Sequence, residues 1–325
     1  MSRIISDFQN KSKKLLLQYG FYFIFFMILI VMGIVRPTFF SLSNLYTILE
    51  DSSMFLIAAA GCTLVIVTGN LDMSVGSIAF MSTAIIVYSQ NANIDPGIAV
   101  ALSLGFGILA GAVNGFLVAK LKLNSMLTTL GLMIAYRGLG QIITGGRGQV
   151  RIASEISDFG KIRALGGLSA VFILVFICMI ILHVLLTKTR FGAYSYAVGN
   201  NKRSAEIIGL PVDKVIFWVY VISGFCGSLS GLATLVKLGT YTKYAGLGLE
   251  FRVIAAIVIG GASLYGGKGK VLPGTFFGVI LLMVISNSLT FLGASVYLYQ
   301  LVQGMVIFIA MYFDSLSSKL VPEHS

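Results

Sequence analysis

The sequence has 325 residues, of which 57% are apolar and only 11% are charged. Ordinary soluble domains carry about 25% charged residues. This composition and a mean hydropathy of +0.94 exclude a soluble globular protein and predict an all-α polytopic membrane protein. The three cysteines lie in apolar runs without metal or redox spacing, and there are two histidines, so no metal site is expected.

Ten membrane spans are predicted, because a spanning helix needs about 20 mostly apolar residues. The basic segment 1–14 is expected to be a cytoplasmic tail without a cleavage site, and 69–74 and 266–270 are expected to be breaks inside membrane-buried regions. The chain is therefore expected to form a single transmembrane domain, 1–325. The predicted spans are 15–35, 52–69, 74–90, 97–119, 123–144, 164–186, 215–236, 253–265, 271–290 and 295–313.

Ten spans place both termini on the same side of the membrane. Most of the 23 Lys and Arg residues also fall on that side, and Arg137 lies within a span. Because cytoplasmic loops carry the excess of Lys and Arg, both termini are predicted to be cytoplasmic. The same bias accounts for the net charge of +11 without nucleic-acid binding.

The stretch "VTGNLDMSVGSIAF" (67–80) places an acid, Asp72, where two apolar runs meet. Ser74 or Asp72 could cap a helix that starts near Val75 at the membrane edge. Alternatively, Asp72 could line or gate a path across the membrane, because an intramembrane acid is costly and often functional. The sequence leaves both interpretations open.

The segment 187–214 is the longest predicted cytoplasmic connection between spans. Within it, Ser204 to Ile208 can form two helical turns with Ile207 and Ile208 on one face, ended by Gly209. A short helix that displays two apolar side chains favours docking into a groove on a partner protein. A helix that lies on the membrane surface is the alternative.

The stretch "GGASLYGGKGK" (260–270) approaches a phosphate-binding loop but does not match it. The first glycine of the pattern is missing, and Gly269 follows Lys268 where a hydroxyl residue is required. The run lies between two apolar segments, and Pro273 falls in the first turn of the second, where proline is tolerated. The glycines are therefore expected to permit a tight reversal and close helix packing rather than nucleotide binding.

Four ordered stretches resemble the permease subunit of ribose-type ABC sugar importers, and the resemblance covers nearly the whole chain. They are "PTFFSLSNLYTIL" (37–49), "TLVIVTGNLDMSVGS" (63–77), "TRFGAYSYAVGNNKRSAEIIGLPVDKV" (189–215) and "IAAIVIGGASLYGGKGKVLPGT" (254–275). The second resembles the family signature Gly-Gly-Ile-Asp-Leu-Ser-Val-Gly. Asn70 stands in place of its second glycine and adds an amide that could hydrogen-bond a hydroxyl-rich ligand.

The resemblance implies a permease in a bacterial inner membrane that imports a monosaccharide or a related polyol by alternating access. It further implies a second permease, identical or related, ABC ATPase subunits on the cytoplasmic face and an extracytoplasmic sugar-binding protein. ATP and magnesium would bind the ATPase, so this chain is expected to hold no cofactor and to have no enzymatic activity of its own.

The family motifs map onto three sets of residues. The signature falls on Gly69, Asp72, Ser74, Val75 and Gly76. The ATPase-coupling pattern falls on Gly199, Asn201, Ala205 and Gly209, and the neighbouring Glu206, Ile207 and Ile208 complete the predicted coupling set. The glycine run falls on Gly260, Gly261, Ser263, Leu264, Gly266, Gly267 and Gly269.

A sugar would need a weakly polar path through the spans. The candidates are Asn70, Asp72, Asn114, Arg137, Gln141, Asn287, Gln300 and Gln303. The alternative for the amides is interhelical hydrogen bonding. Arg137 requires a partner, either Asp72 or a set of backbone carbonyls, unless it extends toward the membrane interface.

Three rival functions remain less consistent with the residues. An ion-coupled secondary transporter with inverted repeats usually places carboxylates or broken helices at the membrane midplane. Asp72 is the one acid near a span centre or break, and the predicted topology places it toward the cytoplasm instead. A channel and an integral-membrane enzyme are the others, and no cluster of catalytic residue types is present. The breaks 69–77 and 260–271 fall in the two halves and could be corresponding parts of an internal repeat.

Overall fold

The computed structural model describes residues 25–295, 297–298, 301–306, 308–309 and 312. The tail 1–14, Gln300 and parts of the first and last predicted spans lie outside the described residues. The chain divides into two compact units, Met1–Ile48 with Ile280–Ser325, and Leu49–Val279, and each is described here by itself.

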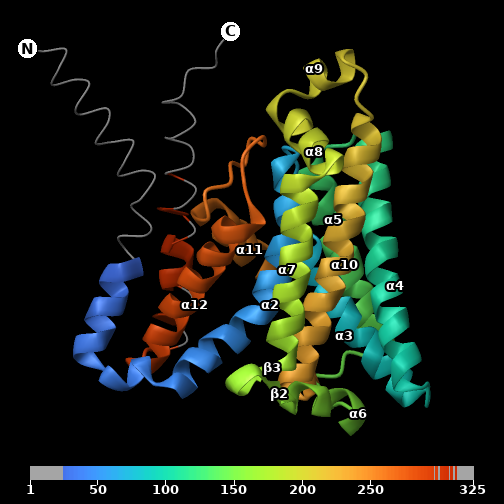
Figure 1. Cartoon of the computed structure of the whole chain (residues 1–325). Helices are drawn as coiled ribbons and strands as arrows, with labels where there is room; N and C mark the ends of the chain where they lie inside the picture. Colours follow the sequence, from blue (N-terminus) through green and yellow to red (C-terminus); the bar gives the residue numbers. More distant parts are fainter. Residues whose placement is uncertain (1–24, 296, 299–300, 307, 310–311, 313–325) are drawn as a thin grey trace, which may run out of the picture. The chain divides into compact units, whose positions relative to one another are not determined.

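The described residues are mostly helical, with two short two-stranded antiparallel sheets, β1–β4 and β2–β3 (Figure 1). A helix over Phe25–Val35 precedes the labelled elements. In chain order these are η1 (Pro37–Phe40), α2 (Leu42–Val67), α3 (Val75–Asn91), α4 (Pro96–Gly115), η2 (Phe116–Lys120), α5 (Ser125–Ile143), β1 (Gln149–Arg151), α6 (Ser154–Ser157), η3 (Asp158–Lys161), β2 (Arg163–Ala164), η4 (Leu165–Gly167), β3 (Leu168–Ser169), α7 (Ala170–Lys188), α8 (Arg190–Asn200), α9 (Lys202–Ile207), α10 (Val212–Leu238), β4 (Thr240–Thr242), α11 (Leu249–Ile259), η5 (Val271–Thr275) and α12 (Phe276–Phe291).

Among the described residues, six helical segments are long and apolar enough to cross a membrane. They are Leu42–Val67, Pro96–Lys120, Ser125–Ile143, Ala170–Lys188, Val212–Leu238 and Val271–Phe291. A helical membrane protein is thereby confirmed, whereas the count of ten spans and the side of the termini remain predictions. The predicted span 253–265 is wrong as a helix, because α11 has 11 residues and ends at Ile259, before the glycine run.

Helix α2 begins ten residues earlier than the predicted span 52–69. The acids Glu50 and Asp51 break the apolar pattern there, but both have cationic partners far along the chain. Arg163 approaches Glu50 at 2.6 Å, and Lys237 pairs with Asp51. Ion pairing therefore allows the helix to extend through residues that the hydropathy pattern excludes.

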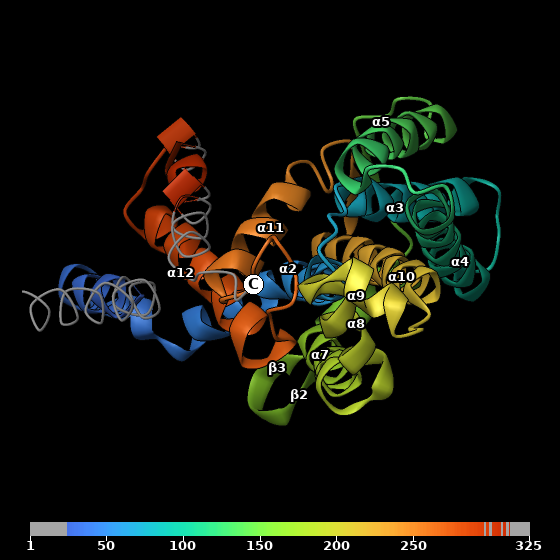
Figure 2. The ribbon, with the colours of Figure 1, turned by 90° about the horizontal axis from the view of Figure 1, so that it is seen from above.

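In the second unit, α10 packs against α4 on one side and α2 on the other (Figure 2). The α4 contact is close because glycines face each other: a side chain at Gly224 would collide with the backbone of Gly107 and Gly111. Small residues at such contacts let membrane helices approach closely, so that backbone packing stabilises them.

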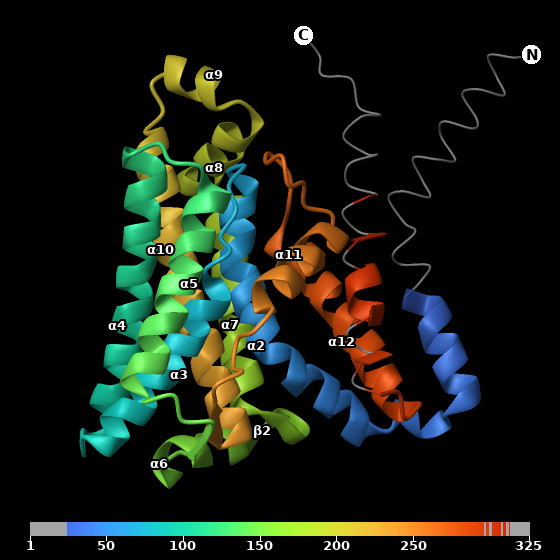
Figure 3. The same cartoon turned by 180° about the vertical axis from the view of Figure 1, so that it is seen from behind.

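Helices α2 and α10 run in opposite directions. The Ser230 hydroxyl donates to the Met54 carbonyl at 2.7 Å, and the Ser223 hydroxyl lies 3.6 Å from the sulfur of Cys62. Residue numbers therefore fall along one helix as they rise along the other. This antiparallel pair defines two ends of the second unit, an α8–α9 end and an α6 end (Figure 3).

In the first unit, a pair of amides joins the start of α2 to the end of α12. Asn44 and Asn287 each donate to the other at 3.0 Å, and Asn44 also donates to the carbonyl of Phe39 at 2.8 Å. The ring of Phe39 packs edge-on against Phe291 with centroids 5.5 Å apart.

Candidate functional site

Between α2 and α3 the backbone leaves the helical path for the residues 68–74. This first break carries Asp72 into the protein interior, where the residue is 2% exposed. One carboxylate oxygen accepts from the Ser74 amide at 3.0 Å and from its hydroxyl at 2.6 Å. The other accepts from the hydroxyl of Ser223, on α10, at 2.8 Å.

Asn114 of α4 extends this network and is fully buried. Its amide nitrogen donates to Ser74 Oγ at 2.7 Å and lies 3.5 Å from Asp72 Oδ1, while its amide oxygen accepts from the hydroxyl of Tyr136 at 3.2 Å. Asp72 and Asn114 are thus hydrogen-bonded to α10 and α5 in this conformation. For Asn114 the geometry matches interhelical hydrogen bonding, one of the two interpretations of the amides that the sequence left open. Ser74, the N-cap residue of α3, makes no side-chain capping bond, so the predicted cap through Ser74 is wrong.

The backbone of the first break is held as firmly as its side chains. The carbonyl of Leu71 accepts from the hydroxyl of Tyr220 at 2.8 Å, and the amide of Met73 donates to the hydroxyl of Thr129 at 3.0 Å. Non-helical backbone is tolerated at membrane depth only where protein or water satisfies it. Side chains from α5 and α10 supply those bonds here.

A second break, 239–248, lies between α10 and α11. It starts at the α6 end, where β4 pairs with β1, and then turns back among the helices. Arg137 of α5 reaches it, donating to the carbonyls of Ala245 at 3.1 Å and Lys243 at 3.4 Å and lying 4.7 Å from the centre of the Phe80 ring. Of the partners considered for Arg137, the structure shows backbone carbonyls rather than Asp72.

The first turns of α3 and α11, the helices that follow the two breaks, lie against each other. A side chain at Gly76, in the first turn of α3, would collide with the carboxylate of Glu250 in α11 and with the carbonyl of Gly246. Gly246 itself has a φ of +66°, which favours glycine. The start of α3 therefore packs on the second break, while the suggested correspondence of 69–77 with 260–271 in an internal repeat stays a prediction.

The predicted coupling segment is not a single loop but contains two helices, α8 and α9. Helix α9 begins after Asn201, whose side chain accepts from the Ser204 amide at 2.9 Å, and it is followed by Gly209 at a φ of +78°. Ala205 is buried, whereas Glu206, Ile207 and Ile208 are exposed. The predicted short helix with an exposed apolar pair is therefore present.

The glycine run packs against both α8 and the first break. A side chain at Gly199 would collide with the backbone of Val67 and of Gly267, and Gly267 donates its amide to the Val67 carbonyl at 2.9 Å. Gly266, at a φ of +90°, lies with its backbone against Gly69. Residues 260–270 thus form a turn that links α11 to the α8–α9 end.

The remaining predicted residues lie apart from this network. Asn70 is half-buried and donates to its neighbour Thr68, Gln141 is exposed on α5, and Gln303 is half-buried in the first unit. Asn287 pairs with Asn44 as described above. The other glycines of the run differ in surroundings: Gly260 packs against Gly274, and Gly261 and Gly269 have positive φ.

Ser223, Tyr136 and Tyr220 could not be predicted as site residues, because a hydroxyl in an apolar helix carries no local signal of its partner. Glu250 offered a signal, since it is an acid within an apolar run, as Asp72 is. It is buried, and its carboxylate lies against Gly76 at the start of α3.

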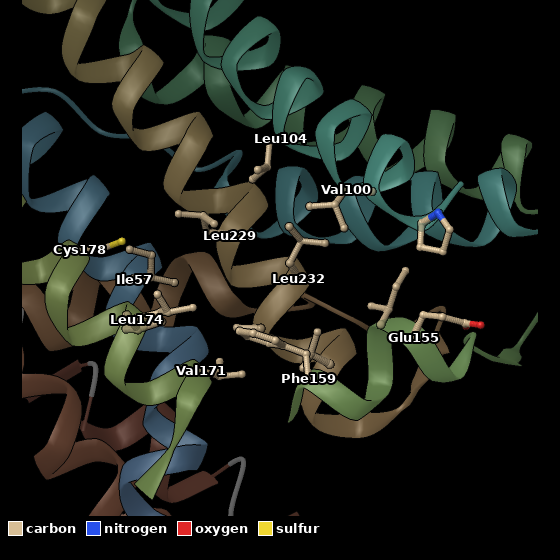
Figure 4. Close-up of a pocket in the computed structure, with 16 residues that line it drawn as sticks. Ile57, Val100, Leu104, Glu155, Phe159, Val171, Leu174, Cys178, Leu229 and Leu232 are labelled. Atoms are coloured by element: carbon tan, nitrogen blue, oxygen red, sulfur yellow. The ribbon is translucent and has the colours of Figure 1, made fainter. Parts of the chain in front are cut away.

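An apolar cavity of about 430 Å³ opens at the α6 end (Figure 4). Its walls come from α4, α7 and α10, with Phe159 and Glu155 at one side. Glu155 is the single charged residue among those lining it. Because a hydroxyl-rich ligand needs several hydrogen-bonding groups, this cavity does not suit a sugar.

The fold and these contacts define a multi-pass helical membrane protein with two broken segments and a projecting pair of short helices. Comparison with known proteins gives the family. The chain belongs to the family described as "Branched-chain amino acid transport system / permease component", whose model matches residues 44–311.

Curated relatives carry more specific names. The ribose import permease RbsC of Escherichia coli (strain K12) is 35% identical over 88% of this chain and 89% of its own length. RbsC of Bacillus subtilis (strain 168) is 33% identical over 89% and 90% of the two chains. The autoinducer 2 import system permease LsrC of Photorhabdus luminescens is 32% identical over 87% and 85%. The resemblance to ribose-type ABC importer permeases is confirmed, and no solved structure matches.

Proposed function

We propose that this chain is the membrane-spanning subunit of an ATP-binding-cassette importer that brings a monosaccharide or a similar polyhydroxylated solute into the cytoplasm. Import proceeds by alternating access, driven by separate ATPase subunits that bind ATP and magnesium. A second permease, the same chain or a related one, completes the pore, and an extracytoplasmic binding protein delivers the solute. The names of the relatives, which import ribose and autoinducer 2, support this substrate class.

The observation that carries the proposal is the exposed apolar pair on α9. Ile207 is 78% exposed and Ile208 is 71% exposed, and they belong to a helix held in place by the buried Ala205. Exposed apolar side chains on a rigid short helix suit the groove of a partner protein. The ATPase is the partner that an importer permease needs at its cytoplasmic face.

The contacts of α8 support transmission of movement from that helix. Gly199 packs on the last residue of α2, Val67, and Tyr196 donates to the carbonyl of Gly269 at 2.6 Å. Val67 directly precedes the first break, and Gly269 belongs to the turn after α11. A shift of α8 and α9 therefore reaches the first break and the turn 260–270 through contacts with their backbone.

The double variant Ile207→Asp, Ile208→Asp tests this assignment. Burying an unpaired polar group costs roughly 2–7 kcal/mol, so we expect at least about a hundredfold weaker ATPase binding and loss of ATP-driven uptake. Tagged wild-type and variant chains are purified in mild detergent from the native membrane, and the co-purifying ATPase is quantified.

Ile162→Asp is the matched control, because Ile162 is an exposed apolar residue at the opposite, α6 end. It should leave ATPase recovery unchanged. Normal ATPase recovery and uptake with the double variant would contradict docking through α9. Uptake by the purified chain under an ion gradient, without any ATPase, would instead establish a secondary transporter.

A further inference from the structure

The second break penetrates far among the helices. Arg137, which holds the carbonyls of Lys243 and Ala245, lies six residues before the end of α5, or about 9 Å along that helix. Gly246 packs on Gly76, which is fifteen residues, or about 22 Å, from the end of α3. Because α5 is a candidate span, the segment lies at membrane depth.

One side of this segment is exposed. Tyr244 is 65% exposed, Leu247 is 59% exposed and Phe251 is 49% exposed, at spacings of three and four residues. Ala245 and Leu249, which alternate with them, are buried. Tyr244 and Leu247 of the second break and Phe251 in the first turn of α11 are together called the aromatic stripe.

Lipid is unsuitable as the neighbour of this stripe. Irregular backbone does not face hydrocarbon at membrane depth and occurs there only against protein or a water-filled cavity. The exposed Lys243 adds a charge beside the stripe, which is costly against lipid. Either a second protein surface or water must cover the segment.

Charged and polar groups near the stripe favour water. Arg137 and Glu250 lie close enough to attract each other, and Arg252 adds a further cation. Gln141 follows Arg137 by four residues and so lies on the same face of α5. The centres of protein interfaces are depleted in charge, whereas a hydrated path for a polar solute accommodates it.

We propose that the aromatic stripe lines the water-filled translocation path and that its rings contact the transported polyhydroxylated solute. This inference rests on the proposed function for the solute, but not for the water. Tyrosine and phenylalanine offer an apolar face to the C–H side of a sugar ring, and the Tyr244 hydroxyl adds a polar end. Arg137 and Gln141 supply donors for sugar hydroxyls.

Cysteine labelling tests the water-filled path. Tyr244→Cys, Leu247→Cys and Phe251→Cys are treated with a charged, membrane-impermeant thiol reagent in right-side-out and inverted vesicles. Leu109→Cys on α4 and Ile181→Cys on α7 are the matched controls, because both residues are exposed on candidate spans. The parent chain, with Cys62, Cys178 and Cys226, sets the background.

We expect labelling of the three stripe positions from at least one side, at least tenfold faster than at the two control positions. Labelling of none of the three from either side would show that lipid or protein covers the stripe and would overturn the inference. Labelling at control positions as fast as at the stripe would also overturn it, since the reagent would then not distinguish water from lipid.

Uptake by the assembled importer tests the solute contact, with D-ribose, D-xylose and D-galactose as probes. Tyr244→Ala and Phe251→Ala should lower the maximal uptake rate about threefold to tenfold, the range for loss of an aromatic stacking contact. Tyr244→Phe, which keeps the ring, should retain more uptake than Tyr244→Ala, and Leu109→Ala should match wild type.

The solute contact and the water-filled path can be overturned independently of each other. Unchanged uptake in both alanine variants would overturn the solute contact even if the stripe is labelled. Labelling of the stripe together with no uptake of any of the three sugars by the wild-type importer would overturn the proposed substrate class and still support a hydrated path.

Discussion

The two breaks of the second unit occupy similar positions between helices but have opposite surroundings. Each follows a long antiparallel helix, α2 or α10, and each leads into a shorter helix, α3 or α11. The first break buries Asp72 in hydrogen bonds from Ser74 and Ser223, whereas the second exposes Tyr244 and Leu247. The first break is thus a fixed joint of the fold, held by buried hydrogen bonds. The second instead presents exposed side chains that we propose contact the solute.

The largest effect is expected from Asp72→Ala. This change leaves the Ser223 hydroxyl and the Ser74 amide without their buried acceptor, while Asn114 keeps its bond to Ser74 Oγ. Each buried donor left unsatisfied costs about 1–3 kcal/mol. We expect a large loss of thermal stability in detergent and reduced amounts in the membrane. Thermal unfolding of purified protein measures the effect.

Asp72→Asn is the control for charge alone, because it keeps one acceptor oxygen and should be milder. An Asp72→Ala protein as stable as wild type but unable to transport would contradict the fixed joint. That result would favour the other interpretation of Asp72, a role in the path.

An intermediate effect is expected where the two breaks meet. In Gly76→Ala, the new methyl group would collide with the Glu250 carboxylate and the Gly246 carbonyl. Forcing a methyl group into a packed site costs typically about 1–3 kcal/mol, measured as a lower midpoint of thermal unfolding.

Gly138→Ala in α5 is the matched control, because nothing lies within 4 Å of the position of its added methyl group. Alanine is preferred over glycine in a helix by roughly 0.5–1 kcal/mol, so this variant should be unchanged or slightly more stable. Equal behaviour of the two variants would show that α3 and α11 do not meet at Gly76.

The smallest effect on overall stability is expected from Arg137→Met. The variant loses hydrogen bonds to the carbonyls of Lys243 and Ala245, each worth roughly 1.5–3 kcal/mol when the donor is charged but less at a half-exposed site. The second break should loosen while the first stays unchanged. Hydrogen exchange of peptides covering 239–248 and 68–74 separates the two, and faster exchange in both would contradict independent breaks.

The class of protein and its family could be predicted from the residues alone. Composition predicted a helical membrane protein, and four ordered motifs predicted the permease family that the comparisons confirm. The short helix with Ile207 and Ile208, ended by Gly209, was also predicted. These features are local, since each depends on residues within a few helical turns.

The partners of the candidate site residues could not be predicted in this way. Asp72 was noted as an acid at a break, but its bond to Ser223 joins residues 151 positions apart. The early start of α2 depends on ion pairs from Arg163 and Lys237 to Glu50 and Asp51. Hydropathy patterns contain no information about which distant charge neutralises a residue.

The sequence by itself determined that the chain is a helical membrane protein and that a short helix displaying Ile207 and Ile208 ends at Gly209. Only the tertiary structure decided that one break is buried and the other exposed, and that Arg137 holds backbone carbonyls rather than Asp72. The physical reason is that apolar periodicity is a local property, whereas hydrogen bonds and close glycine contacts form between helices that are distant in the chain.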